Sequence, residues 1–387
     1  SNGALDKYEY DSFGNLINVK DSSGNSTYYT YNGFDQKLSE NSSATGLTTY
    51  QYDINGNLIS IIRANDTKTI YSYDALNRRT KAQTGNQIQL WTYDNCTNGL
   101  GRLCATSDGV ISKGYGYTKA GKLSVQITDV EGTKYPYYWL YDSQERLIGE
   151  GHNLDNYITL YEYDALNRIS AVKFKIGENI QPVVNNITYE PYGGIKNWTY
   201  GNGLNRQVSY DQDYRLTGIS TGNYQNLSHN YNTNNWITQI NNGLDYSKST
   251  SYAYDDLGQL TQANSNAFSE NWNLDSNANR LSRASSSTGL TNYSIGIGNR
   301  LVNTTNSEQQ NFIYDKLGNL TQKSGHGGTF DYAYDGFNRL KTVSSAKGIT
   351  TYDYDVFNLR SRKINNGNRT DYIYAPNGNL LGETYQV

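Results

Sequence analysis

A short pattern recurs along the whole chain: an aromatic residue, any residue, tyrosine, aspartate, two further residues, glycine, asparagine and leucine. Its clearest copies have tyrosine, aspartate and glycine at Tyr10, Asp11 and Gly14, at Tyr52, Asp53 and Gly56, and at Tyr314, Asp315 and Gly318. A variant has Asn-Arg in place of Gly-Asn, with Tyr73, Asp74 and Asn77, then Tyr163 and Asp164, then Tyr334 and Asp335. Repetition at a fixed period is the signature of an architecture in which each unit packs on its neighbours.

The tyrosine that precedes the aspartate, called here the ladder residue, gives the period. From Tyr10 to Tyr374 the mean spacing is about 21 residues, and the spacing widens between Tyr93 and Tyr189. Two rungs are degenerate, at Leu274 and Ile295. No linker or change of composition interrupts the series. We therefore expect residues 1–387 to form one domain of about eighteen repeats, without an additional toxin or core-associated domain.

Each unit has a local physical interpretation. Two aromatic residues separated by one residue lie on the same face of a strand. The aspartate carboxylate accepts a backbone N–H two residues later and starts a turn, and glycine or asparagine then takes a left-handed backbone conformation. Leucine or isoleucine begins a second strand, as at Leu16, and a second turn leads to the next unit. One repeat is therefore two short strands, so about eighteen repeats predict about thirty-six antiparallel strands.

These strands predict an all-β fold, in which tandem hairpin repeats form one long curved or spiral antiparallel sheet. A wide sheet curls because its strands twist. At ~4.8 Å per strand the sheet is roughly 170 Å wide, and one circle of that length is about 55 Å across. Side chains cannot fill a ring of this width. We expect an open or partial hollow shell of roughly one circuit.

Composition supports this fold and excludes several classes of function. The chain has 38 tyrosines but 8 phenylalanines, and 36% of its residues are hydrophobic, which argues against a thick aliphatic core. A net charge of −3 does not favour nucleic acid as a partner. No apolar run is long enough to span a membrane. The absence of methionine suggests an excised fragment, with Ser1 and Asn2 as a cloning remnant.

The units resemble those of the Rhs, or YD-repeat, family, which includes bacterial polymorphic toxins, insecticidal toxin complex B and C components, wall-associated proteins and teneurins. The hexapeptides Tyr-Asp-Ala-Leu-Asn-Arg that begin at Tyr73 and Tyr163 are close to the consensus, and the resemblance extends from Tyr8 to Glu383. It implies a spiral β-shell that encloses a C-terminal toxin in toxin members and supports cell adhesion in teneurins. The releasing region with paired aspartates that toxin members carry after the repeats is not found before Val387.

We therefore expect a non-catalytic shell segment of an exported bacterial protein, secreted or at the cell surface. Its partner would be its own C-terminal effector or a companion shell component. The alternative is an extracellular adhesion or carbohydrate-binding module that uses exposed aromatic residues. The tryptophans are candidates for stacking on sugars, although packing of neighbouring repeats and lining of the shell is the favoured role: Trp91, Trp139, Trp198, Trp236 and Trp272.

No catalytic, cofactor or metal site is expected. Aspartates that recur every twenty or so residues are explained by turn formation rather than by a catalytic pair. The segment from Asp53 to Asn57 resembles the start of a calcium loop but lacks its bidentate glutamate. The three histidines, His152, His229 and His326, lack metal-ligand spacing. Cys96 and Cys104 bracket an expanded turn and can form a local disulfide or remain free thiols.

Overall fold

The computed structural model describes residues 5–153 and 157–386, so Ser1 and Asn2 lie outside the described residues. Within these ranges the chain forms 36 strands of one antiparallel sheet, in which each strand pairs with the strand before and after it. The all-β prediction and its strand count are confirmed. The sheet does not close on itself, because β1 pairs with β2 and β36 pairs with β35 as the two ends of the series.

The strands of the first half are β1 (Lys7–Tyr10), β2 (Leu16–Lys20), β3 (Ser26–Tyr31), β4 (Lys37–Ser42), β5 (Gly46–Tyr52), β6 (Leu58–Ile62), β7 (Lys68–Tyr73), β8 (Arg79–Thr84), β9 (Gln87–Tyr93), β10 (Leu103–Ser107), β11 (Ile111–Tyr117), β12 (Leu123–Val130), β13 (Thr133–Tyr141), β14 (Leu147–Asn153), β15 (Tyr157–Tyr163), β16 (Ile169–Ile176), β17 (Asn179–Tyr189) and β18 (Ile195–Tyr200).

The second half comprises β19 (Asn205–Tyr210), β20 (Leu216–Thr221), β21 (Gln225–Tyr231), β22 (Ile237–Asn242), β23 (Thr250–Tyr254), β24 (Leu260–Asn264), β25 (Ser269–Leu274), β26 (Arg280–Ser285), β27 (Gly289–Gly296), β28 (Arg300–Asn306), β29 (Gln310–Tyr314), β30 (Leu320–Gly325), β31 (Phe330–Tyr334), β32 (Leu340–Ser345), β33 (Gly348–Tyr354), β34 (Arg360–Asn365), β35 (Asn368–Tyr374), β36 (Leu380–Gln386) and the 3-10 helices η1 (Tyr246–Lys248) and η2 (Ile297–Asn299).

Two kinds of turn connect the strands, and each kind occupies its own rim of the sheet. The turn after each odd-numbered strand follows a ladder residue and is called here an Asp turn. The turn after each even-numbered strand is called a return turn. Because consecutive strands run in opposite directions, all Asp turns lie along one rim and all return turns along the other.

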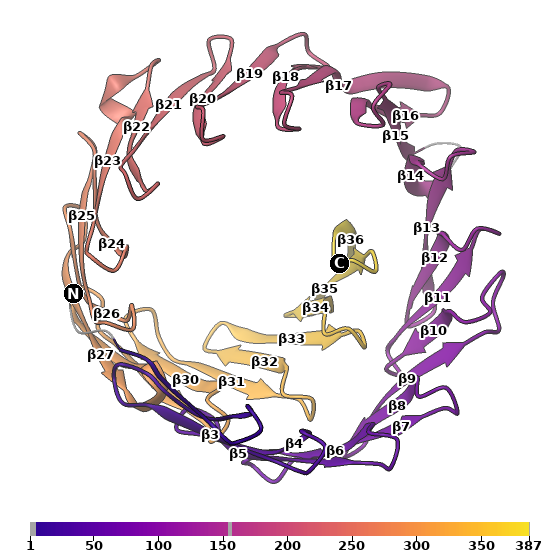
Figure 1. Ribbon diagram of the computed structural model, residues 1–387, viewed down its shortest axis with the longest axis vertical. Coiled ribbons are helices and arrows are strands. Elements are labelled where there is room, and N and C mark those ends of the chain that lie inside the picture. The colour runs from indigo at the N-terminus through magenta and orange to yellow at the C-terminus, as the bar shows by residue number, and fades with distance from the viewer. Residues whose placement is uncertain (1–4, 154–156, 387) are drawn as a thin grey trace.

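Each hairpin carries a β-bulge beside its ladder residue. In β7–β8, Ser72 pairs with Lys81 while the next residue, Tyr73, pairs with Arg79, so Thr80 is left over. The same shift occurs at the ladder residue of hairpins throughout the chain, for example at Tyr10 and Tyr354. A bulge bends its strand and increases local twist. Its repetition once per hairpin bends the sheet into the ring that Figure 1 shows.

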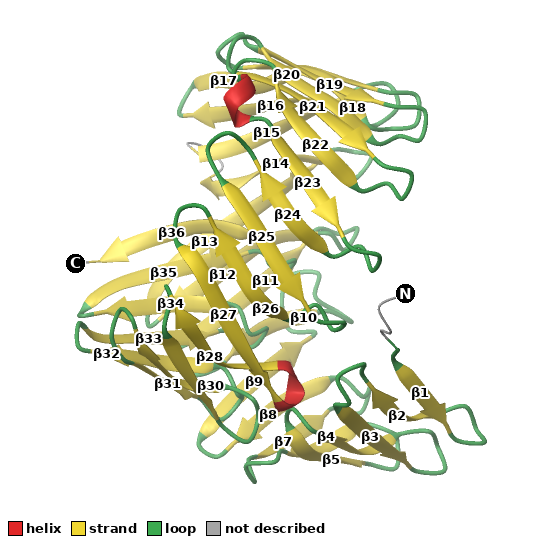
Figure 2. Ribbon diagram, turned by 90° about the vertical axis from the view of Figure 1, so that its left-hand side faces the viewer, coloured by secondary structure: helices red, strands yellow, loops and turns green. Residues whose placement is uncertain are grey.

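The ring winds past one full circuit and becomes a spiral (Figures 1 and 2). In the β2–β3 return turn Ser23 accepts a hydrogen bond of 2.8 Å from Asn277 in the β25–β26 Asp turn, 254 residues away. In the β8–β9 return turn Gln87 accepts one of 2.6 Å from the backbone of Gly336, in the β31–β32 Asp turn. Strand β25 follows β2 by 23 positions, as β31 follows β8, so one circuit takes 23 strands.

The expectation of roughly one circuit is therefore wrong, since 36 strands make roughly one and a half circuits of this spiral. The estimate assigned every strand to a single circle and derived the width of the ring from that assumption. Curvature is set instead by the bulge and twist of each hairpin. These bend the sheet more tightly than a single circle of all the strands requires.

The last hairpins leave the wall and lie inside the ring (Figure 1). Strands β33–β36 cover the inner face of β11–β14, where Tyr137, Trp139 and Ala375 form a small buried core. Leu381 of β36 packs against this core. The thickest part of the molecule is therefore where the end of the spiral meets its first circuit.

Candidate functional site

The Asp turns share one hydrogen-bonding pattern. One carboxylate oxygen of Asp53 accepts the backbone N–H groups of Asn55 and Asn57, at 2.9 and 2.8 Å. The other accepts the side-chain amide of Asn57 at 2.9 Å. Gly56 has a φ of 84°, which a residue with a Cβ rarely adopts. The hydrogen bond from the Asn57 amide is the main reason that the pKa of Asp53 is held below its ordinary value.

The Asn-Arg variant keeps this turn and adds a link to the next one. Asn77 takes the left-handed position with a φ of 59°. Arg78 donates to Asp74 at 2.7 Å, reaches Asp94 of the following Asp turn at 2.6 Å, and lies 4.4 Å from the ring centre of Tyr93. Backbone and guanidinium N–H groups of Arg78 hold the pKa of Asp74 below its ordinary value. Arginine at this position therefore ties neighbouring repeats along the rim.

Stability is expected to fall in acid because of these turns. The ordinary pKa of an aspartate is 3.8, and it is lowered in the folded state at Asp53 and Asp74, among others. A lowered pKa stabilises the fold fully above the unfolded value and ceases to do so as the pH falls through the folded value. The urea midpoint should be steady from about pH 7 to 5 and should drop below about pH 4.

A matched variant tests the origin of this acid sensitivity. The Asp turn after β3 begins with Asn32, whose side-chain oxygen accepts from the backbone of Phe34 and Gln36 in the same way. Asp53→Asn should therefore preserve the turn and remove one titrating group. A variant whose urea midpoints decline with acid as steeply as those of the parent would show that this carboxylate is not a source of the effect.

The ladder tyrosines make a second repeated contact, which explains why the chain uses tyrosine rather than phenylalanine. The hydroxyl of Tyr73 donates at 2.8 Å to the carbonyl of Leu58, the first residue of β6. Equivalent bonds join Tyr31 to Leu16, and Tyr354 to Leu340. Each bond spans two neighbouring repeats and satisfies a carbonyl beside a bulge. The excess of tyrosine was the only sequence signal for this contact.

Tyr73→Phe should lower the free energy of unfolding by about 1 kcal/mol, the net value of one partly buried hydrogen bond. Urea unfolding measured by tryptophan fluorescence would detect the change. Tyr224 is an exposed aromatic residue in a return turn, and Tyr224→Phe serves as the control. Equal stability of the two variants would argue against a contribution from the ladder hydroxyl.

The structure places the repeat residues in equivalent local settings but does not gather them into one site. The turns that begin at Asp11, Asp164 and Asp335 have the same pattern of carboxylate to backbone N–H bonds as Asp53. Gly14 and Gly318 have left-handed φ angles of 89° and 83°. Along the Asp-turn rim these carboxylates belong to successive hairpins. Each of them binds the backbone of its own turn.

Cys96 and Cys104 form a disulfide across the β9–β10 Asp turn, with their α-carbons 5.3 Å apart. Gly99 lies over this bridge, and a Cβ at that position would be 2.3 Å from the sulfur of Cys96. Only glycine therefore fits there. The bridge closes an expanded turn within one hairpin, so its role is local.

The other sequence candidates fall in separate places. Among residues 5–153 and 157–386, no three His, Cys, Asp or Glu side chains are grouped closely enough to hold a metal ion. The ring nitrogens of His152 lie 3.2 Å from the carbonyl of Pro136 and 3.3 Å from that of Leu381. His229 is partly buried, which lowers its pKa, and His326 lies in the β30–β31 return turn. In the described part of the chain, no helix is long and apolar enough to span a bilayer.

The ladder face of the sheet is the inner face of the ring. Lys113 and Tyr115 lie on the same face of β11 as the ladder residue Tyr117. Lys113 contacts Asp355 in the β33–β34 turn, within the hairpins that Figure 1 shows inside the ring. Trp91, Trp139 and Trp272 each precede a ladder residue by two positions and therefore also face inward. Trp139 is buried, and the other four tryptophans, including Trp198 and Trp236, are half-buried. Carbohydrate binding by these residues stays a prediction.

A buried polar network ties the last hairpins to this inner face, and the repeat pattern did not reveal it. Lys113 and Asp355 form an ion pair of 2.7 Å with side chains 1% and 2% exposed. Gln126 of β12 donates to the carbonyl of Tyr374 at 2.8 Å. The first circuit thus provides charged and amide groups for the end of the spiral.

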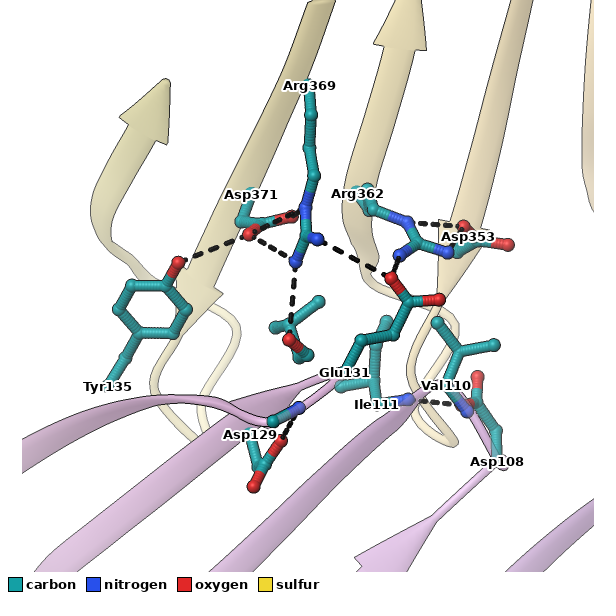
Figure 3. A network of polar contacts seen from close by, with 12 residues as sticks. Asp108, Val110, Ile111, Asp129, Glu131, Tyr135, Asp353, Arg362, Arg369 and Asp371 are labelled. Carbon is teal, nitrogen blue, oxygen red and sulfur yellow. Dashed lines mark hydrogen bonds and ion pairs between the residues drawn. The ribbon is translucent and has the colours of Figure 1, made fainter. Parts of the chain in front are cut away.

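Figure 3 shows the neighbouring part of this network. Arg369 of β35 donates three hydrogen bonds to the fully buried Asp371, at 2.9, 3.1 and 2.8 Å, and one to the carbonyl of Val130 at 3.2 Å. Arg362 of β34 donates a hydrogen bond of 2.7 Å to Asp353. It also forms an ion pair with Glu131, in the β12–β13 return turn. Burial alone would raise the pKa of Asp353, but hydrogen bonds from Lys341 and Arg362 hold it below its ordinary value.

Comparisons with known proteins agree with this architecture. The crystal structure of TcdB2-TccC3 has a TM-score of 0.84 and 17% identity, over 97% of this chain and 23% of that chain. The Photorhabdus luminescens Tc holotoxin pore with a TccC3 mutation has a TM-score of 0.83 and 17% identity, over 97% and 22%. The TcdB2-TccC3-Cdc42 crystal structure has a TM-score of 0.82 and 16% identity, over 97% and 23%.

This chain thus spans less than a quarter of each of those chains, and at such identities the likeness shows a shared fold. No curated protein matches the sequence. Two family profiles do match, Teneurin YD-shell over residues 224–381 and RHS Repeat over residues 52–89. Together with the repeated Tyr-Asp turns, these matches directly support assignment of the chain to the Rhs/YD-repeat family.

Proposed function

We propose that residues 1–387 form a single non-catalytic domain, a wall segment of a hollow β-shell. The shell encloses and shields a C-terminal toxin or effector polypeptide of an exported bacterial protein. The observation that carries this proposal is the position of β36, which lies within the outline of the ring in Figure 1. Ladder tyrosines line the inner face of the surrounding wall. Figure 2 shows that β36 ends at the edge of the molecule along the ring axis, so a polypeptide segment joined after it would begin at the mouth of the ring.

The chemistry of the wall suits an enclosed and partly unfolded chain. Tyrosine rings offer apolar surface, and their hydroxyls are engaged with the wall itself, as at Tyr73 and Tyr354. Such a surface contacts many sequences weakly and binds none of them specifically. The continuous pairing of strands leaves few edges at which an enclosed chain could add as a further strand. The structural relatives are toxin complexes that contain TccC3, which supports a companion or effector as partner.

Protection of a fused passenger tests the proposal. A protease-sensitive polypeptide fused after Val387 should be digested more slowly than the same polypeptide fused before Ser1, because β36 lies within the outline of the ring (Figure 1) whereas β1 is a strand of the wall. Limited proteolysis followed by mass spectrometry measures both rates.

Two controls sharpen this experiment. Arg369→Ala should reduce protection, because it removes contacts that hold β35 to the return turn at Val130. Arg215→Ala, which removes an ion pair of similar length to Asp211 on the far arc, should leave protection unchanged. Equal digestion of passengers at the two ends would reject the enclosing role.

A further inference from the structure

The two rims of the sheet already contact each other inside one molecule. Asp turns of β25–β32 lie on return turns of β2–β9, as Gln87 and Gly336 illustrate. The approach is close, since a Cβ at Gly336 would lie 2.8 Å from the Gln87 side-chain oxygen and 2.9 Å from the Thr84 methyl group. An Asp-turn rim and a return-turn rim are therefore complementary surfaces.

Docking changes the exposure of one position in the Asp turn. The apolar residue two places after the first residue of the turn is Leu317 in the β29–β30 turn, which packs beside the β4–β5 return turn and is 9% exposed. On the first circuit the same position is Phe34, 85% exposed, and Leu76, 69% exposed. Phe34 and Leu76 are two hairpins apart, about 20 Å along this rim. The turn between them has Asn55 at the same position and the fully exposed Ile54 just before it, so each of the three turns presents an apolar side chain. Large exposed apolar side chains gathered along one rim mark a contact surface.

On the arc formed by β15–β24, the return turn between β20 and β21 resembles the β8–β9 return turn. Unlike that turn, it is not covered by the second circuit. The turn from Thr84 to Gln87 reads Thr-Gly-Asn-Gln, and the turn from Thr221 to Gln225 reads Thr-Gly-Asn-Tyr-Gln. In both turns the threonine pairs with the glutamine. The second turn borders a hollow of about 600 Å³. Thr221 lines this hollow, is 7% exposed, and has a side-chain oxygen without a hydrogen-bond partner in the structure.

We propose that this chain associates head to tail with a second copy of itself. The Asp turns of β3–β8 of one copy dock on the return turns of β18–β21 of its partner. A second copy is the expected partner because each chain has both complementary rims. Contact between the rims of two copies would repeat the contact that joins the two circuits of one chain. An interface between unlike surfaces does not pair the copies symmetrically, so copies can add at either end. This association does not depend on whether the shell encloses a toxin.

Sedimentation velocity over about 1 to 100 µM tests the association. The parent chain is expected to form dimers and larger species as its concentration rises. Two variants block one rim each: Phe34→Ser with Leu76→Ser on the Asp-turn rim, and Asn202→Asp with Tyr224→Asp on the return-turn rim. All four residues are exposed, so the fold should be preserved, which circular dichroism and thermal unfolding would verify. Each variant alone should remain monomeric.

Mixing the two variants gives the decisive result. Each variant keeps one functional rim, so an equimolar mixture should form a dimer that cannot extend further. The control Tyr385→Ser changes an exposed aromatic residue on β36 and should associate like the parent. The proposal is overturned if the parent is monomeric throughout, if either variant associates like the parent, or if the mixture remains monomeric.

Discussion

Lys113→Ala is expected to lower the free energy of unfolding by about 3–5 kcal/mol, the usual effect of removing one partner of a buried ion pair. The ammonium group of Lys113 contacts the carboxylate of Asp355, and both side chains are almost completely buried. Without the ammonium group, the buried Asp355 carboxylate between the first circuit and the last hairpins loses its ion-pair partner. Because Asp355 also accepts the backbone N–H groups of Phe357 and Leu359, the β33–β34 turn should loosen.

Urea unfolding provides the measurement, and an exposed ion pair provides the control. Lys248 and Asp245 are 3.2 Å apart but their side chains are 69% and 41% exposed, so Lys248→Ala should change stability by less than about 1 kcal/mol. Lys113→Met combined with Asp355→Asn should recover part of the loss, since no unpaired charge remains. If Lys113→Ala costs no more than Lys248→Ala, the buried pair does not hold the last hairpins to the wall.

Arg369→Ala should have a loss of similar size, about 3–5 kcal/mol, because it leaves Asp371 buried and without its cation. Asp371 is fully buried, and its remaining side-chain partner is the hydroxyl of Tyr135 at 3.2 Å. The change also removes the hydrogen bond to the carbonyl of Val130. Hydrogen exchange should therefore accelerate in β34–β36 more than in the upper arc of the ring.

The comparison variant is Arg215→Ala. Arg215 contacts Asp211 at 2.7 Å, but this pair lies in one Asp turn of the far arc and is partly exposed. Its removal should be far less destabilising and should not alter exchange in β34–β36. Faster hydrogen exchange confined to β35 would mean that Arg369 stabilises only its own strand and does not hold the last hairpins to the first circuit.

The repeat unit could be predicted from the sequence because its information is local. Asp74 and Asn77 act within a few residues of each other, and the structure contains the turn and left-handed position that they predict after the strand that Tyr73 ends. The number of circuits could not be obtained in this way. It depends on the curvature of each bulge, such as the one at Thr80, and small errors accumulate over all strands.

The network that joins the two circuits had no repeated signal. Lys113 and Asp355 are 242 residues apart, and Asp355 occupies an ordinary turn position in the repeat. A weaker signal did exist, because the ladder spacing widens between Tyr93 and Tyr189. In this stretch β12 and β13, with 8 and 9 residues, accommodate the last hairpins, whereas β16 and β17, with 8 and 11 residues, contact their neighbours in sequence. A lengthened repeat alone therefore does not identify which repeats have non-neighbouring partners.

The spiral thickens the wall on one side alone. Within the described chain, β15–β24 contact their neighbours in sequence, whereas β2–β14 are also held by the second circuit. Local opening requires less free energy where fewer contacts must break. The upper arc of Figure 1 is thus the natural place for a breach. Neighbouring strands of this arc can separate and pair again while the contacts between the two circuits hold the opposite side of the molecule together.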